Sequence, residues 1–446
     1  MKDSILWGCI ADDFTGASDA ASFFVKGGLK TVLFNGLPSP ASVGNCQAVV
    51  IALKTRTQET PFAVQDSLSA ARWLKGQGAK QLYIKYCSTF DSTPKGNIGP
   101  VLDALLEEYN LPCTILCPAL PVNGRQVIQG RLYVNGVPLD QSPMSQHPLT
   151  PMWDSRISVL MEAQSKYPSV HVGRGLYALP IGRTADKIQR FYAEHPRFYI
   201  IPDYEEEGDA AAIADRFGHL PLLSGGSGLV SELARRMSHG RKGASLPERK
   251  SHKDGATEYE PGANRENGRN RDDQPKAPGS GLLLAGSCSD MTRRQIAWAR
   301  SHHIPSLKII PQRLLDGSQT QEELWHFIRS HQGQDVLIYS SDSPENVQSV
   351  QESGKERVAQ LLEQTMAWLA GQAVASGYTR IIVAGGETSG AVTKALGFDS
   401  YLIGESVAPG VPVMVPQNRP DIRLVLKSGN FGQEDFFLKA LSLTSQ

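Results

Sequence analysis

The sequence predicts an α/β protein made of two α/β domains with mainly parallel sheets, joined by a flexible linker. Short apolar runs alternate with helical stretches in both halves of the 446-residue chain, a pattern typical of parallel strands covered by helices. A polar segment at 240–280, rich in Gly and Pro, separates the halves and has almost nothing to bury. We therefore expect domains at 1–239 and 281–446, with a disordered linker at 240–280.

The first half reads as a series of strand–helix pairs. The expected strands are ILWGCIA (5–11), TVLF (31–34), AVVIAL (48–53), QLYIK (81–85) and TILC (114–117). The expected helices span about 15–26, 60–76 and 100–109. The runs are mostly aliphatic, which favours strands buried on both faces.

The second half repeats this style. The expected strands are GLLLAG (281–286), SLKII (306–310), DVLIYS (335–340) and RIIVAGG (380–386), with helices near 290–302, 321–331 and 355–376. Two further runs, VPVMV (411–415) and IRLVLK (422–427), lie close together in the chain. Their short connection is compatible with antiparallel pairing.

Composition excludes several classes of protein. The formal net charge is zero, with 40% hydrophobic and 20% charged residues, so nothing indicates a nucleic-acid partner. We also expect no membrane partner, since no apolar run is long enough to span a bilayer and the N-terminus does not resemble a signal peptide. The six cysteines show no CxxC spacing, which favours reduced thiols and a cytoplasmic location. The sequence leaves a homo-oligomer open.

Two adjacent aspartates follow the first expected strand. Ligands of open α/β sheets bind beyond the carboxyl ends of strands, and the first such end reads ADDFTG, with Asp12 and Asp13. Adjacent carboxylates repel one another, so they are either solvated or face a cation. Carboxylates can orient a hydroxyl proton or hold a hydrated magnesium ion. Both are candidate catalytic residues; we expect Asp12 to act on the substrate and Asp13 to cap the helix beginning near 15.

Basic and polar residues at the other strand ends of the first half predict a site for a small acid. Lys54 and Arg56 are two residues apart in ALKTRT, so they face one side of an extended chain and could clamp a carboxylate. Further candidate substrate-binding residues are Lys85, Thr89 and Asp91 in KYCSTFDST, and Asn123 and Arg125 in CPALPVNGR. Each stretch taken alone is equally compatible with a solvated loop.

Glycine-rich turns in the second half predict a nucleotide site. In VAGGETSGAV, Gly385 and Gly386 allow close backbone approach, and Thr388 or Ser389 can cap a helix whose free N–H groups attract an anion. LAGSCSDMT and LKSGNFG add two similar turns. No GxxxxGK[ST] or GxGxxG motif is present, so neither a P-loop nor a dinucleotide fold is indicated. Each turn alone is compatible with a tight connection, but the three together favour a phosphate cradle.

The chain resembles the four-carbon acid sugar kinase family through seven motifs that occur in order: IADDFTGASDAASFFVKGG, ALKTRT, KYCSTFDSTPKGNIGPV, CPALPVNGRQVIQGRLYVNGVPLDQSPMSQHPLTPMWDS, SGGSGL, AGSCS and AGGETSGAV. The resemblance covers most of both halves and is nearest to the branch acting on 3-oxo-tetronate; sister branches act on threonate or erythronate. It implies an N-terminal substrate domain and a C-terminal nucleotide domain. The segment at 240–280 is longer and more charged than this family leads us to expect, which concerns linker geometry and not chemistry.

The resemblance also implies a reaction. An ATP-dependent enzyme of this family, with Mg²⁺ expected, would phosphorylate the terminal C4 hydroxyl of a four-carbon sugar acid. The family's ATP contacts would fall on Ser287, Gly385, Gly386, Glu387, Thr388, Ser389 and Gly429. The sequence does not identify metal ligands.

Two other classes of protein could use similar strand-end residues. A sugar-acid dehydrogenase or aldolase would need a dinucleotide fingerprint, which is missing, or a Schiff-base lysine, which the sequence does not reveal. A nucleotide-binding regulator without chemistry would not need the acid-rich strand ends of the first half. A kinase is therefore the leading hypothesis.

Overall fold

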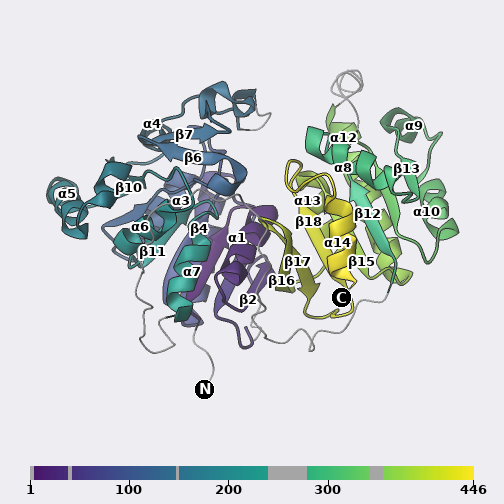
Figure 1. The fold of residues 1–446 in the computed structure, drawn as a ribbon, viewed down its shortest axis with the longest axis horizontal. Helices are drawn as coiled ribbons and strands as arrows, with labels where there is room; N and C mark the ends of the chain where they lie inside the picture. The colour runs from purple at the N-terminus through teal and green to yellow at the C-terminus, as the bar shows by residue number, and fades with distance from the viewer. Residues whose placement is uncertain (1–4, 39–42, 147–149, 240–278, 342–354, 446) are drawn as a thin grey trace, which may run out of the picture.

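The computed structural model describes residues 5–38, 43–146, 150–239, 279–341 and 355–445. Two lobes lie side by side in Figure 1, the first half of the chain in purple to teal and the second in green to yellow. The linker predicted at 240–280 falls outside the described residues, except for 279 and 280. No helix in the described part of the chain is long and apolar enough to cross a bilayer.

One large sheet runs through both lobes, with twelve strands among the described residues. The first half contributes, in spatial order, β11 (Leu222–Gly225), β4 (Gln81–Lys85), β1 (Trp7–Ala11), β3 (Ala48–Ala52) and β2 (Thr31–Asn35). The second half continues with β16 (Ser400–Ala408), β17 (Val411–Pro416), β18 (Arg423–Lys427), β15 (Arg380–Ala384), β12 (Gly281–Ala285), β14 (Val336–Tyr339) and β13 (Ser306–Lys308).

The sheet is parallel within each half and antiparallel at the junction. The five first-half strands pair in parallel, as do β18, β15, β12, β14 and β13. Between them, β16 and β17 pair antiparallel, and Val413 of β17 faces Val425 of β18 as the sequence suggested. The α/β fold class is confirmed. The two halves are also joined by backbone hydrogen bonds, because β16 pairs with β2.

Two smaller sheets extend the first lobe. A parallel sheet has the order β5 (Cys113–Ile115), β10 (Phe198–Pro202) and β9 (Ser169–Val172), and an antiparallel sheet contains β6 (Arg125–Ile128), β7 (Arg131–Val134) and β8 (Val137–Pro138). Of these strands the sequence predicted only β5, at 114–117, among the parallel strands of the first half. It lies instead beside β10, because strand order depends on contacts distant in the chain.

Helices cover the large sheet on both faces (Figure 1). The helices of the first half are α1 (Phe14–Lys26), α2 (Thr60–Gly76), α3 (Ile98–Glu108), α4 (Ile157–Glu162), α5 (Ile181–Glu194), α6 (Asp209–Phe217) and α7 (Val230–His239), of which α4 and α5 pack on β9 of a smaller sheet. In the second half they are α8 (Asp290–Ser301), α9 (Pro311–Leu315), α10 (Gln321–Ser330), α12 (Lys355–Ala375), α13 (Gly386–Leu396) and α14 (Phe436–Thr444). Short 3₁₀ helices span Pro121–Asn123, Leu139–Gln141, Pro143–Gln146 and Arg174–Ala178.

Helix α1 lies where the two lobes meet. It packs against β2, β3 and α7 of its own half and against β16, β17 and α13 of the other. Its small residues, such as Gly16, Ala17 and Ala20, are buried and allow this close approach from several sides, while Phe23 and Phe24 fill the core. The N-terminus of α1 therefore lies next to elements of the second half.

Candidate active site

The carboxyl ends of strands from both halves border one cavity of about 400 Å³. The first half lines it with the start of α1, the residues that follow β3 and β4, and Arg125. The second half lines it with the start of α13, the turn between β16 and β17, and the turn after β18. Residues predicted separately for a sugar acid and for a nucleotide therefore border the same space.

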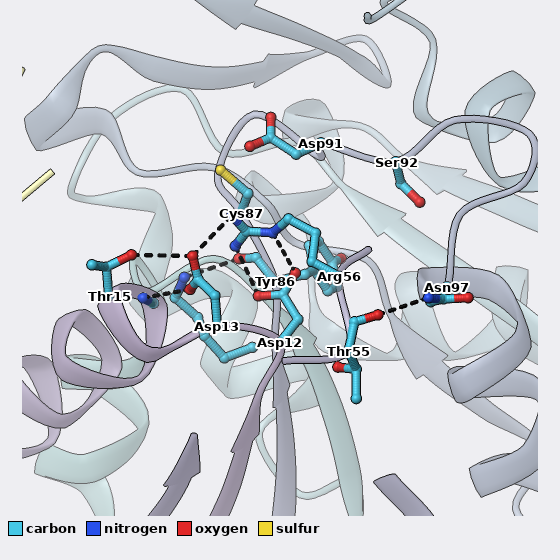
Figure 2. Close-up of polar contacts among 12 residues, drawn as sticks. Asp12, Asp13, Thr15, Thr55, Arg56, Tyr86, Cys87, Asp91, Ser92 and Asn97 are labelled. Carbon is cyan, nitrogen blue, oxygen red and sulfur yellow. Dashed lines mark hydrogen bonds and ion pairs between the residues drawn. The ribbon is translucent and has the colours of Figure 1, made fainter. Parts of the chain in front are cut away.

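The cation that the aspartate pair requires is Arg56. Its Nε and Nη2 donate to the two carboxylate oxygens of Asp12, both at 2.9 Å, and its Nη1 lies 2.9 Å from Asp13 (Figure 2). Strands β1 and β3 are neighbours and end in register at Ala11 and Ala52, which brings these residues together. Opposite charge in a desolvated site explains how adjacent carboxylates are tolerated here.

This pairing changes the roles expected from the sequence. Arg56 was predicted to clamp a substrate carboxylate, but its guanidinium is directed at the two aspartates. Lys54, its predicted companion, is exposed and does not line the cavity. The extended geometry that placed both cations on one side does not persist, because the strand ends at Ala52.

Asp13 caps α1, as predicted. Its Oδ1 accepts from the Gly16 N–H at 2.6 Å and its Oδ2 from the Thr15 hydroxyl at 3.1 Å (Figure 2). Although burial acts to raise it, the pKa of Asp13 is lowered, because Arg56, Lys85 and these donors favour the ionised form.

The two aspartates face different spaces. Asp13 lines the cavity between the halves and its side chain is 30% exposed. Asp12 lines a smaller cavity behind Arg56, and burial raises its pKa. The assignment of Asp12 as the acid that meets the substrate is therefore not what this geometry favours: the capping residue, Asp13, is also the one directed at the shared cavity.

A second ion pair lies deeper in the same cavity. Lys85 and Asp19 are both buried, with 3.4 Å between Nζ and Oδ2, and Lys85 also donates to the Tyr86 carbonyl at 2.9 Å. Burial raises the pKa of Asp19 in spite of the lysine. The pKa of Lys85 is raised, because Asp19 and the Asp12–Asp13 pair outweigh the effect of its burial. Lys85 thus stays protonated beneath the cavity.

The loop after β4 carries Thr89 and Asp91 to the cavity. The Thr89 hydroxyl donates to Asp91 Oδ1 at 2.6 Å and lies 3.0 Å from the sulfur of Cys87. Phe90 has φ 64° and Asp91 φ 21°, a region that bulky residues rarely adopt. Phe90 is fully buried, with its ring edge-on to Tyr86 at 5.5 Å between centroids. Packing of the aromatic ring holds this strained turn in place.

Arg125 enters the cavity from the start of β6. It donates to the carbonyl of Asn123, and no carboxylate lies within ion-pair distance of it among the described residues. Burial lowers its pKa, although a guanidinium remains charged at neutral pH. Asn123 itself lines a neighbouring, larger cleft of about 890 Å³, which Arg125 also lines.

The three glycine-rich turns of the second half lie side by side, because β12, β15 and β18 are neighbours in the sheet. A Cβ on Gly286 would fall 2.0 Å from the Thr388 hydroxyl oxygen, and one on Gly429 would fall 2.4 Å from that of Ser287. These distances are far below van der Waals contact, so glycine is required for the turns to pack together.

The start of α13 faces the cavity with free backbone groups. Gly385, with φ 134°, is the N-cap, and the first helical N–H bond within α13 runs from Ser389 to its carbonyl at 2.9 Å. A Cβ on Gly386 would meet nothing within 4 Å. The N–H groups at 386–388 are therefore available to an anion at the positive end of the helix.

The predicted side-chain cap of this helix is wrong. Thr388 and Ser389 are buried in the first turn and not at its N-cap, because α13 begins two residues earlier, at Gly386. Thr388 packs on Gly286 instead. In the equivalent junction after β12, Ser289 is the N-cap of α8 and accepts from the Thr292 N–H at 3.3 Å.

A buried lysine holds the turn after β18. Lys427 is 1% exposed, and its Nζ donates to the carbonyls of Gly429 and Ser428 at 2.7 and 3.1 Å and to the Thr292 hydroxyl at 3.0 Å. Burial lowers the pKa of Lys427 to about 7. Three acceptors match the three donors of an ammonium group.

From the sequence, Asp19 could face the site or be solvated, and Lys427 was not predicted. Asp19 lies one turn after Thr15 on α1, so helical spacing was a signal for it. No sequence pattern indicated that Lys427 is buried near the site, because a lysine at the end of a strand is normally solvated. Among the described residues, no group of three or more His, Cys, Asp or Glu side chains is arranged to hold a metal ion.

Comparison with known proteins agrees with this division of the site. The family model described as the sugar-binding N-terminal domain matches residues 7–233, and the one described as the nucleotide-binding C-terminal domain matches 282–437. A Cupriavidus necator protein named 3-oxo-tetronate kinase is 41% identical over 98% of this chain and 96% of its own length. A Brucella melitensis protein of the same name is 39% identical over 98% and 96%.

Solved structures share the fold over nearly the whole chain. A Salmonella typhimurium LT2 protein, solved under a provisional name as a tRNA synthase, has a TM-score of 0.83 and 37% identity, covering 97% of this chain and 98% of that one. Haemophilus influenzae protein HI1011 has a TM-score of 0.76 and 36% identity, covering 98% and 100%. Together with the two domain models and the near full-length relatives, this similarity shows that the chain belongs to the four-carbon acid sugar kinase family, among the members named 3-oxo-tetronate kinase.

Proposed function

We propose that this protein transfers the terminal phosphoryl group of ATP to the C4 hydroxyl of 3-oxo-tetronate. The observation that carries the proposal is the cavity of about 400 Å³ that the acid-binding and glycine-rich residues share. A phosphoryl transfer requires donor and acceptor in one water-restricted space, with positioning and electrostatics supplying most of the rate. The names of the relatives supply the substrate.

ATP fits the second half of the cavity by its chemistry. The triphosphate would be held by the N–H groups at the start of α13, where Gly386 leaves open space, and by the turns at Ser287 and Gly429. Glu387, which lines the cavity, and Asp13 would face the Mg²⁺ that accompanies the phosphates. ATP supplies the phosphoryl group, and Mg²⁺ neutralises charge on its oxygens.

Asp13 is the residue suited to the acceptor hydroxyl. Its lowered pKa keeps it ionised at neutral pH, so it can accept the hydrogen bond of the C4 hydroxyl and orient the oxygen toward the phosphorus. As the new O–P bond forms and the bond to ADP breaks, the hydroxyl proton passes to this carboxylate and then to water. Asp12 acts one step away, by fixing the guanidinium of Arg56 that contacts Asp13.

The test is ADP release by the purified full-length chain with ATP and MgCl₂. We expect the highest kcat/KM with 3-oxo-tetronate and lower values with D-threonate and D-erythronate. The phosphorus NMR signal of the product should be a triplet, since the C4 carbon carries two hydrogens. ADP release that does not depend on any of the three acids would contradict the proposal, and preference for threonate or erythronate would change the substrate but not the reaction.

A further inference from the structure

Among the described residues, three cationic side chains line the cavity, and two of them form ion pairs with carboxylates of the protein. Arg56 is shared between Asp12 and Asp13 at 2.9 Å, and Lys85 lies 3.4 Å from Asp19. The three carboxylates of this cluster outnumber its two cations. A substrate carboxylate placed against Arg56 would therefore meet Asp12 and Asp13 as well, and like charges at such short range repel.

Arg125 is differently placed. The donors of its guanidinium meet one backbone carbonyl, that of Asn123, and its Nε is buried without a hydrogen-bond partner among the described residues. A buried donor without a partner is unfavourable unless a ligand completes it. Its nearest acidic neighbour by electrostatic influence is Asp91, which already accepts the Thr89 hydroxyl at 2.6 Å.

We propose that Arg125, and not Arg56, binds the carboxylate of the sugar acid and thereby selects acids over neutral sugars. The proposal deepens the proposed function and rests on it for the identity of the substrate. The planar fork of a guanidinium matches a carboxylate with two parallel hydrogen bonds. Burial also strengthens the attraction of Arg125 for a carboxylate supplied by a ligand.

The orientation of the substrate follows from this assignment. Arg125 enters from the hairpin of β6 and β7, whereas Asp13 lies at the start of α1 and the phosphate-facing turns lie on the second half. A four-carbon acid with its carboxylate on Arg125 can then direct its far end, the C4 hydroxyl, toward Asp13. The 3-keto and 2-hydroxyl groups would then meet other polar side chains that line the same cavity, among them Thr89, Ser88 and Lys85.

The test compares a charged ligand with a neutral one. Erythrulose has the four-carbon skeleton and 3-keto group of 3-oxo-tetronate, with –CH₂OH in place of the carboxylate. Binding of 3-oxo-tetronate, D-threonate and erythrulose is measured by calorimetry for the wild type and for Arg125→Met, Arg125→Lys and Arg131→Met. Arg131 is the matched control, since it lies on the same hairpin, is exposed and does not line the cavity.

We expect Arg125→Met to weaken binding of both acids about 10- to 100-fold, the range for loss of a charge-assisted hydrogen bond, while erythrulose and ATP change less than about 3-fold. Arg125→Lys should keep part of the preference for acids, and Arg131→Met all of it. Loss of ATP affinity with acid binding intact would assign Arg125 to the phosphates and overturn the proposal. Equal weakening of acid and neutral ligand would also overturn it, as would unchanged binding of all three.

The binding measurement separates this proposal from the proposed function. If the wild type binds the acids but releases no ADP, the kinase assignment fails while the role of Arg125 is still tested. Thermal unfolding of each variant checks the fold. Arg125→Lys, which retains the charge and most of the volume, keeps the comparison valid if the methionine variant does not fold.

Discussion

The two sides of the shared cavity present different chemistry to a ligand. The first half offers charged side chains, and four of them, on Asp13, Asp19, Arg56 and Lys85, are already held in ion pairs. The second half offers mainly backbone from the turns around Gly386 and Gly429, with the buried Lys427 behind them. Side chains that are already held in ion pairs have fixed positions around a small polar ligand. Glycine-rich backbone instead allows phosphate oxygens to approach closely. The difference indicates that the halves recognise different ligands and meet only at the reacting groups.

The largest effect is expected at Asp13, the carboxylate proposed to contact both the acceptor hydroxyl and the Mg²⁺ that accompanies ATP. Asp13→Asn should lower kcat about 10²- to 10⁴-fold, because the hydroxyl loses its proton acceptor. Stability should change by less than about 1 kcal/mol, since Asn also caps helices well. Steady-state kinetics and thermal unfolding measure the two effects. Asp12→Asn is the comparison: an inactive Asp12→Asn beside an active Asp13→Asn would restore the assignment made from sequence.

ATP binding by the second half should be lost when a side chain is placed where the phosphates must approach the backbone. Gly386→Val should abolish measurable ATP binding in calorimetry and leave the fold intact, since a Cβ there meets nothing within 4 Å. Acid binding should persist. Gly371→Val on α12 is the matched control, because that glycine is also free of contacts within 4 Å. Unchanged ATP affinity in Gly386→Val would place the cradle elsewhere.

The ion pairs of the first half are disrupted most directly by replacing Arg56. Arg56→Ala leaves Asp12 and Asp13 without their cation, which should lower the free energy of unfolding by about 2–3 kcal/mol. This is less than for a fully buried pair, because 23% of the Arg56 side chain is exposed. Urea unfolding measures the loss, and kcat should fall more than acid affinity. A stable variant with a raised KM for the acid alone would identify Arg56 as the carboxylate clamp and contradict the role of Arg125.

Lys427 should make ATP binding by the second half depend on pH. Its pKa is lowered to about 7 by burial, so the three-donor ammonium is present below that pH and lost above it. ATP affinity should therefore fall about 2- to 5-fold from pH 6 to pH 8.5, as one of the hydrogen bonds to the turn is lost. Lys427→Met should bind ATP more weakly at pH 6 and lose this part of the dependence.

Stability should follow the opposite trend. Between pH 7 and the ordinary lysine pKa of 10.5, the unfolded chain binds the proton and the folded chain does not, so this group adds stability as pH rises, at most about 1.4 kcal/mol per unit. Thermal unfolding from pH 7 to 9 should show a flatter slope in Lys427→Met. A wild type whose ATP affinity and stability rise together would contradict this account of Lys427.

The smallest effect is expected at the segment that separates the halves in sequence. Shortening 240–280 to a flexible tether should change kcat and the unfolding temperature little, because its composition offers little to bury and because β2 and β16 join the halves independently. Far-UV circular dichroism and turnover are the measurements. A shortened chain that fails to fold would show that the segment is structural.

Local pattern was sufficient for most elements of the large sheet and its helices. The predicted strand at 81–85 and helix at 60–76 have the bounds of β4 and α2. An uninterrupted apolar run and a long helical stretch are both formed by residues that are adjacent in the chain, so local sequence is enough to predict them. The strands β6 to β10 and β16 were not predicted. Short half-buried strands such as Arg125–Ile128 carry little periodic signal, but this does not explain β10, which is buried along its whole length. The same locality explains why Asp13 was identified as a helix cap: the donor it meets is three residues away.

The sequence by itself determined the α/β class, the charged and glycine-rich motifs at the strand ends, and the resemblance to a known family. Each of these depends on residues that are contiguous in the chain. Only the tertiary structure decided what those motifs face. The pairing of β16 with β2 and the ion pairs of Arg56 with Asp12 and Asp13 each join residues far apart in the chain. Strand order and packing fix such contacts, and no local pattern encodes them, so the charge that remains for a ligand could be found only after the protein's own ion pairs were known.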